Sequence, residues 1–353
     1  MATTRSPKRG KNPAARTAVS LADVARRAKV DASTASRALS GSLRHRMRED
    51  TRARIVEVAR ALGYHPNLVA RGLRTARSYS LGIIVPQLDN PVYAQMITGA
   101  EAAAREFGYA LLIVRVGQGD DGIRAVERLA RMNRADGILI ASLDDGSTLA
   151  PALKRANVPC VALNRPAAGV ANCVQLDTRR GAAIAVRHLV QLGHRRIAHL
   201  AGLPGGAGAL DRLAGYRDAL AESGIRFDAG MVEVGGYTAE GGERAMRDVL
   251  RRVTPPPTAV FAATMMSAAG AMKAMRATGL VVPKDISIVA IHDGILAEML
   301  EPPLTTVRLP TQEMGYEAAR GLVDLIEGRV ARVVRVLSPR ELAVRSSTAP
   351  PRN

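Results

Sequence analysis

Apolar residues recur at helical spacing in three short stretches near the start of the chain. The segment SLADVARRAKVDASTASRALS, residues 20–40, places Ser20 in front of one stretch and Asp31 in front of the next, and both side chains can cap a helix. A third stretch, 51–62, repeats apolar residues on one stripe and ends before Gly63. Helices this short are unstable alone, so we expect all three to share one small core, with the first two forming a helix-turn-helix.

From residue 81 the pattern changes to short apolar runs, each followed by a helical stretch. The runs cover 81–86, 110–114, 137–141, 158–163, 196–202, 258–263 and 286–292. The predicted helices cover 91–107, 121–134, 181–192, 209–223, 239–252 and 266–279. This alternation predicts an α/β fold with parallel sheets. About 270 residues favour two doubly wound lobes, with a ligand cleft between them at the carboxyl ends of the strands.

The positive charge of the chain is concentrated at its amino end. Of a net charge of +18 over 353 residues, residues 1–80 carry 18 Lys and Arg against 5 Asp and Glu, or +13. A compact segment with such a field attracts polyanions, of which nucleic acid is the usual one. An evenly basic, merely solubilising surface is the alternative. Residues 1–19 predict a disordered basic arm, and 346–353 predict a disordered tail.

Several other classes of site and location are disfavoured by the sequence. No apolar run is long enough to span a membrane and no apolar stretch follows the basic amino terminus, so we expect a cytoplasmic protein. Cys160 and Cys173 lack metal-ligand spacing and are predicted to be structural thiols. The stretch GLPGGAG, 202–208, matches neither a Walker loop nor GxGxxG and predicts a flexible loop at the cleft. We expect no metal and no cofactor.

The second helix of the helix-turn-helix is predicted to read DNA. The amino end of such a helix meets base edges in the major groove. Ser33, Thr34 and Arg37 lie on its outward face, and Arg37 can approach a guanine with two hydrogen bonds. The capping residues Ser20 and Asp31 belong to the same predicted DNA-binding set. An ordinary helical hairpin is the alternative.

Residues 64–78, YHPNLVARGLRTARS, predict a linker that forms a helix only on DNA. Apolar residues recur at helical spacing, arginines face outward, and Gly72 weakens the helix. Leu73 could wedge between base steps in the minor groove. The predicted DNA-binding residues of this segment are Asn67, Ala70, Arg71, Leu73 and Arg74.

Several motifs in order resemble the lactose/galactose repressor (LacI/GalR) family from about residue 18 to 348. They are VSLADVARRAKVDASTASRALS, YHPNLVARGL, HLVQLGHRRIAHLAG, DRLAGYRDAL, PTAVFAA and PPLTTVR. The resemblance implies a homodimer or dimer of dimers on a palindromic operator, and a two-lobed core, similar to periplasmic sugar-binding proteins, that senses a small molecule. By position, it implies that Ala32, Ser33 and Arg37 read bases and that Leu73 intercalates. The implied division is a headpiece (20–65), a hinge (66–78) and a core (79–345).

The resemblance also implies an effector site, from which this chain departs in part. Tyr93, Arg212 and Tyr237 match the aromatic walls and the ligand arginine of the family. The polar positions at which the family hydrogen-bonds a sugar do not match. Asn164 and His292 stand where the family usually has aspartates, and Thr264 lies where the family commonly has the sequence AND. The predicted effector-binding set is Tyr93, Asn164, Arg165, Arg212, Tyr237, Thr264 and His292. In the headpiece, Lys29 replaces the turn glycine and Arg48 replaces a capping serine.

These departures change the ligand that the cleft is expected to take. Sugar hydroxyls need paired acceptors, and each unsatisfied hydroxyl costs about 1–3 kcal/mol. Arg212, with help from a protonated His292, suits a carboxylate or phosphate on a small molecule. A packed core histidine beside Asp293 is the alternative for His292.

The predicted function is a DNA-binding transcriptional regulator, acting as a homodimeric repressor under the control of a small, acidic effector. A secreted solute-binding protein would share the core but would lack residues 20–78. An α/β enzyme would need a nucleophile with its base, a metal set or a phosphate loop, none of which the sequence contains. The residues leave both signs of regulation open.

Overall fold

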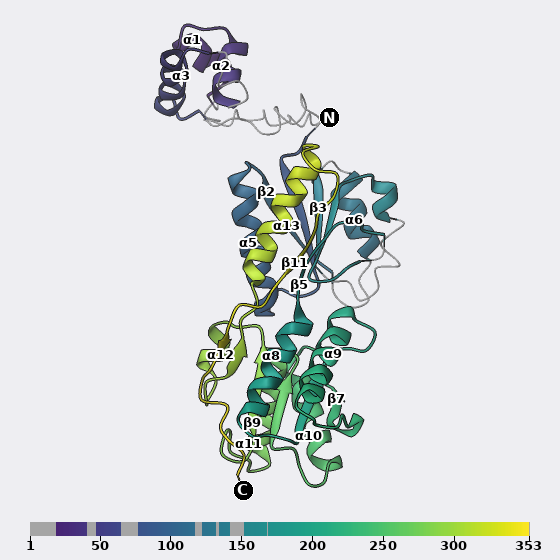
Figure 1. Cartoon of the computed structure of the whole chain (residues 1–353). Coiled ribbons are helices and arrows are strands. Elements are labelled where there is room, and N and C mark those ends of the chain that lie inside the picture. The colour runs from purple at the N-terminus through teal and green to yellow at the C-terminus, as the bar shows by residue number, and fades with distance from the viewer. Residues whose placement is uncertain are drawn as a thin grey trace, which may run out of the picture. The chain divides into compact units, whose positions relative to one another are not determined.

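A computed structural model describes residues 19–40, 47–64, 77–116, 122–131, 134–141, 152–167 and 169–352. The chain divides into two compact units, 1–77 and 78–353 (Figure 1). None of the helices in these ranges is both long and apolar enough to cross a membrane.

The smaller unit contains the three predicted helices around one core. They are α1 (Leu21–Arg27), α2 (Ala32–Ser40) and α3 (Glu49–Ala61). Val24, Ala35 and Ile55, one from each helix, are fully buried against each other. This confirms the predicted headpiece fold, since each helix contributes an apolar stripe to a core that none could form alone.

The turn between α1 and α2 forms without the glycine that usually occupies it. Lys29 adopts a left-handed backbone with φ of 51°. The left-handed region is unfavourable for a residue with a Cβ, by roughly 1–2 kcal/mol, so the surrounding contacts must hold the turn. The amino-terminal caps of α1 and α3 differ. Ser20 and Asp23 form the predicted capping box, whereas Arg48 precedes α3 without a side-chain cap.

The larger unit contains two six-stranded sheets, which define two lobes. The first sheet has the order β11-β5-β4-β3-β1-β2 and all its strand pairs are parallel. Its strands are β1 (Ser80–Val85), β2 (Ala110–Arg115), β3 (Gly137–Ala141), β4 (Cys160–Leu163), β5 (Cys173–Leu176) and β11 (Val334–Leu337). Helices α5 (Pro91–Glu106), α6 (Gly122–Arg131) and α13 (Thr311–Ile326) pack on this sheet.

The second sheet has the order β12-β10-β9-β8-β6-β7, parallel except for the pair of β10 and β12. Its strands are β6 (Ile197–Ala201), β7 (Val232–Val234), β8 (Ala259–Ala262), β9 (Ser287–Ile291), β10 (Thr305–Val307) and β12 (Leu342–Ala343). Its helices are α8 (Thr178–Gln191), α9 (Ala207–Glu222), α10 (Ala239–Arg252), α11 (Met265–Ala277) and α12 (Ile295–Met299). The predicted α/β fold with two doubly wound lobes is confirmed.

The chain passes between the lobes three times, after β5, after β10 and after β11 (Figure 1). The three crossings are hydrogen-bonded to each other. The Asp177 amide donates to the Leu337 carbonyl at 2.9 Å, and the Arg308 and Arg340 backbones bond the second crossing to the third. The second and third crossings run in opposite directions, as do β10 and β12 beside them, and the three short connections join the lobes while leaving the ends of their strands facing one another.

The carboxyl terminus is packed on the second lobe, so the prediction of a disordered tail from residue 346 is wrong. Ser347 is fully buried, and its hydroxyl donates to the Ile288 carbonyl at 2.6 Å and accepts from the Thr305 amide at 2.8 Å. His194 bonds the Ala349 carbonyl at 2.8 Å. The polar composition suggested disorder, but here the hydroxyls serve as hydrogen-bonding partners for the amino ends of β9 and β10.

Replacing Ser347 with Ala should lower the free energy of unfolding by about 1–3 kcal/mol, because the Thr305 amide would be left buried without an acceptor. Ser346→Ala is the matched control, because Ser346 is exposed and its loss should change stability by less than about 0.5 kcal/mol. Urea denaturation of the full chain measures both values. Equal midpoints for the two variants would contradict a structural role for the tail.

Candidate functional site

The amino-terminal turn of α2 carries a network of exposed polar side chains. The Asp31 carboxylate accepts hydrogen bonds from the hydroxyls of Ser33 and Thr34, both at 2.6 Å, and from the Thr34 amide at 2.8 Å. These bonds, first those from Ser33 and then those from Thr34, hold the pKa of Asp31 well below its usual range. Arg37 donates to both hydroxyl oxygens, at 3.1 and 3.2 Å. The structure therefore brings four predicted DNA-binding residues together on one surface.

The other predicted DNA-binding residues differ in position. Ala32 is the first residue of α2 and is exposed beside this network. Ser20 is at the start of α1, where its side chain caps that helix. The predicted hinge residues Asn67, Ala70, Arg71, Leu73 and Arg74 lie outside the described residues.

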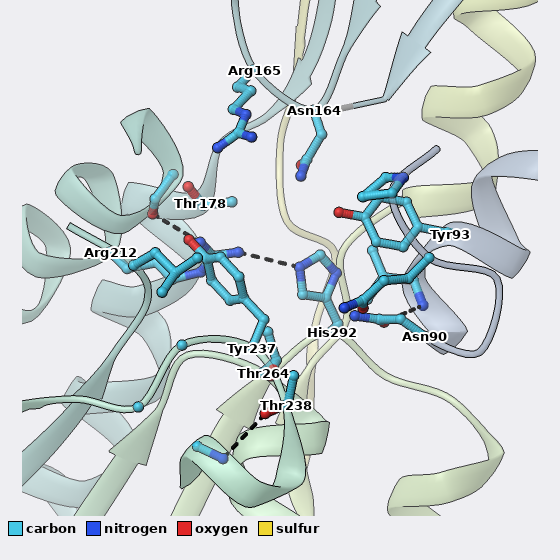
Figure 2. Close-up of a pocket in the computed structure, with 18 of the residues that line it drawn as sticks. Asn90, Tyr93, Asn164, Arg165, Thr178, Arg212, Tyr237, Thr238, Thr264 and His292 are labelled. Carbon is cyan, nitrogen blue, oxygen red and sulfur yellow. Dashed lines mark hydrogen bonds between the residues drawn. The ribbon is translucent and has the colours of Figure 1, made fainter. Parts of the chain in front are cut away.

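A cleft of about 460 Å³ lies between the two lobes of the larger unit. All seven predicted effector-binding residues line it, from both lobes (Figure 2). Sequence reasoning missed further polar residues of the lining, namely Gln87, Asn90, Arg115, Thr178, Thr238, Glu240 and Arg244. Most of these follow a strand or begin a helix, which is the only signal in the sequence that could have indicated them.

Two of the lining residues have strained backbones. Asn164 follows β4 in the first lobe with φ of 70°, and His292 follows β9 in the second lobe with φ of 67°. A left-handed conformation costs free energy in a residue with a Cβ, and such strain is concentrated at functional sites. Both residues direct their side chains toward the cleft in Figure 2.

Arg212 is a buried cation at the centre of the lining. Only 4% of its surface is exposed, and it donates to the Gly208 carbonyl at 2.9 Å. Its guanidinium carbon lies 5.7 Å from the centre of the Tyr237 ring. Burial lowers the pKa of Arg212, and Tyr237 and Asp211 oppose that effect. No carboxylate among the described residues hydrogen-bonds this guanidinium, and its Nε is buried without a partner.

His292 is a neutral acceptor rather than a second cation. Burial and the charge of Arg212 lower its pKa to about 3, so the prediction of a protonated His292 is wrong. Arg212 Nη2 lies 3.5 Å from His292 Nε2 and donates to it. The imidazole proton is then on Nδ1, 3.4 Å from the Thr311 hydroxyl. This pairing leaves neither ring nitrogen available to accept from a ligand hydroxyl.

The described lining of the cleft carries mostly positive charge. Among the described residues, its lining includes four arginines, Arg115, Arg165, Arg212 and Arg244, against one carboxylate, Glu240. Helices α5, α8, α9, α10 and α11 all begin at the cleft, so the positive ends of their dipoles add to this charge. Besides Arg212 Nε, Asn164 Oδ1 and Thr178 Oγ1 are buried without a partner. Such atoms are expected where a ligand completes the hydrogen bonding.

The described residues contain no cluster of three or more His, Cys, Asp or Glu side chains that could hold a metal ion. The two thiols are buried, which raises the pKa of Cys160 to about 12 and that of Cys173 to about 11. Neither cysteine is therefore a reactive thiolate at neutral pH.

Comparison with known proteins assigns both units. Residues 20–67 match the model of bacterial regulatory proteins of the lacI family, and 186–348 match a periplasmic binding protein-like domain. The regulator CelR of Thermobifida fusca is 36% identical over 333 residues, which cover 92% of this chain and 96% of CelR. The chain belongs to the LacI family. GalR of Escherichia coli strain K12 is also 36% identical, over 90% of this chain and 92% of GalR.

Solved structures of LacI-family members match both units. A CelR–cellobiose complex is 35% identical with a TM-score of 0.70, covering 93% of this chain and 99% of that one. A lac repressor dimer bound to operator and the anti-inducer ONPF is 28% identical with a TM-score of 0.77, covering 94% and 100%. This LacI-family chain is therefore a DNA-binding transcriptional regulator and not an enzyme.

The low pKa of His292 predicts how the stability of this LacI-family protein changes with pH. An unfolded chain binds a proton at His292 near pH 6.5, whereas the folded chain does so only near pH 3. Because the unfolded chain gains this proton first, the free energy of unfolding falls as the pH drops below 6.5, by up to about 1.4 kcal/mol per pH unit. In His292→Gln the free energy of unfolding should fall less steeply between pH 7 and 4.5. An unchanged slope, or an imidazole NMR signal of His292 that titrates near pH 6.5, would contradict the assignment.

Proposed function

We propose that the chain is a repressor that binds a palindromic operator as a homodimer and changes its operator affinity when a small acidic molecule occupies the cleft. The observation that carries the effector assignment is Arg212, a buried guanidinium with an unpartnered Nε and no carboxylate partner among the described residues. The proposed division is a basic arm (1–19), a DNA-binding headpiece (20–65), a hinge (66–78) and an effector-binding core (79–345).

The exposed network on α2 supports its proposed role in reading DNA. Arg37 is held by its own helix through the Ser33 carbonyl, at 3.2 Å, and through two hydroxyls. A guanidinium held in this way is positioned before it meets a base, so less side-chain entropy is lost on binding. Arg37 then donates to a guanine in each half-site, and basic residues of the headpiece and arm contact phosphates.

Homodimerisation is supported by an apolar surface on the core. Ile295 and Met299, on the short helix α12, are 69% and 76% exposed. Burying these two side chains against a second subunit would remove their apolar surface from water and so favour association. A dimer would place two headpieces on the two halves of a palindrome.

In the hinge, Leu73 is proposed to insert between base steps.

An acidic effector fits the cleft better than a neutral sugar does. The CelR structure contains cellobiose, a neutral sugar. In this chain His292, at a position where the family usually has an aspartate, already accepts a hydrogen bond from Arg212. Glu240 is the single carboxylate among the described residues of the lining, so most ligand hydroxyls near these residues would lack an anionic acceptor. A carboxylate or phosphate instead pairs with Arg212 and satisfies its Nε.

Replacing Arg37 with Ala should cost about 1–3 kcal/mol of operator binding, confined to one base position of each half-site. The affinities of parent and variant for operators substituted at each position measure this, at fixed salt. Loss of the same size on every sequence would show that Arg37 contacts a phosphate instead.

Replacing Arg212 with Ala should abolish the effect of effectors on operator affinity while leaving ligand-free operator binding unchanged, because Arg212 lies in the core. Arg217→Ala is a matched control on the same helix, since Arg217 stacks on Phe227 at 4.2 Å and does not line the cleft. Operator affinity is measured with and without small acids that stabilise the parent chain. A retained response in Arg212→Ala would contradict the proposal.

A further inference from the structure

The glycine-rich loop 202–208 leads directly into the uncapped start of α9. Gly205 has φ of 79°, and Gly206 precedes the helix without any side-chain cap. Because the first amides of a helix have no partner within it, Ala207 and Gly208 present free N–H groups at this end. Gly208 lines the cleft, so a sixteen-residue helix begins there with its positive end uncovered.

Two arginines from opposite lobes flank this helix start. A Cβ on Gly206 would lie 3.3 Å from Nη1 of Arg165, and a Cβ on Gly208 would lie 3.0 Å from Nη1 of Arg212. Arg165 comes from the first lobe, just after β4, and Arg212 lies one turn further along α9. Figure 2 shows Arg165 directed from the first lobe toward Thr178, Tyr237 and Arg212. The two glycines therefore allow both guanidinium groups to approach the backbone at the helix start closely.

Two buried polar atoms at this place have no hydrogen-bond partner among the described residues. Thr178, the first residue of α8, is 2% exposed and its Oγ1 makes no hydrogen bond. Arg212 is 4% exposed and its Nε likewise makes none. Buried hydroxyl and guanidinium groups are almost always hydrogen-bonded, so these two atoms are positions at which a ligand oxygen could complete the hydrogen bonding. This observation is independent of the helix end.

We propose that this corner of the cleft is an oxoanion subsite for the phosphate group of a phosphate monoester. The proposal rests on the proposed function and names the class of its effector. A phosphate monoester carries about two negative charges at neutral pH and three terminal oxygens. The subsite supplies two guanidinium groups, two backbone amides and one hydroxyl, which is more charge and more donors than one carboxylate can use. Tyr93 and Tyr237 line the remaining cleft, beside the organic part of the ligand.

The test measures thermal unfolding of the full chain with inorganic phosphate, against acetate at the same ionic strength and pH 7.5. Phosphate at ten times its dissociation constant should raise the melting temperature by about 2–4 °C, and acetate should have little effect. Arg165→Gln and Thr178→Val should each weaken phosphate binding at least tenfold. Arg217→Gln, which removes the same charge from the far part of α9, should bind phosphate as the parent does.

Equal stabilisation by phosphate and acetate, or equal loss in Arg217→Gln and Arg165→Gln, would overturn the phosphate subsite. The latter result would indicate an adventitious ion only, held by general positive charge. Thr178→Val keeps the size of the side chain, so a normal melting temperature without ligand shows that it is folded. If phosphate fails but another acid changes operator affinity through Arg212, the phosphate subsite is wrong and the proposed function stands. If no ligand changes operator affinity, the proposed function itself fails.

Discussion

The buried charge of Arg212 is the constraint on which the organisation of the cleft depends. Removing a guanidinium from water is costly unless hydrogen bonds and opposite charge compensate for it. This cost is offset only in part here. The guanidinium contacts the Gly208 carbonyl, the neutral His292 ring and the face of Tyr237, but its Nε has no hydrogen-bond partner among the described residues. Burial, and then the charge of Arg212, lower the pKa of His292 and keep it unprotonated. This incomplete compensation is the basis of the proposal that the effector is an anion.

The residue after His292 connects the cleft to the parts that join the lobes. Asp293 accepts hydrogen bonds from Thr306, Arg308 and Arg345. Burial opposes ionisation of Asp293, but these bonds outweigh it and lower its pKa to about 2. Its backbone carbonyl accepts from Gln95 of the first lobe at 2.8 Å. His292 in the cleft is therefore next in sequence to a residue that is hydrogen-bonded both to the second crossing and to α5.

Local features of the sequence predicted much of this structure. Ser20 and Asp31 indicated the starts of α1 and α2 because capping is a contact within three residues. The apolar runs indicated seven strands, of which six are nearly or fully buried, whereas β2 is exposed or half-buried along its length. Sequence periodicity missed α13, which follows the second lobe in the chain but packs on the first. It also missed short strands such as β10 and β12.

Contacts between distant segments could not be predicted from the sequence. Ser347 looked like part of a disordered tail because its partners, Ile288 and Thr305, lie more than forty residues away. Thr178 gave no signal, since its role depends on where α8 begins relative to the cleft. The residue types at His292 and Arg212 suggested an acid-binding site, but the protonation state of His292 follows from burial, which the sequence does not reveal.

The measurement that tests the central claim most directly is a thermal-unfolding screen of the full chain with matched pairs of small molecules, each an acid and its neutral analogue. The account predicts that stabilising compounds are acids and that each loses most of its effect when the acidic group is replaced by a neutral one. Neutral members that stabilise the chain as strongly as their acidic partners would contradict it.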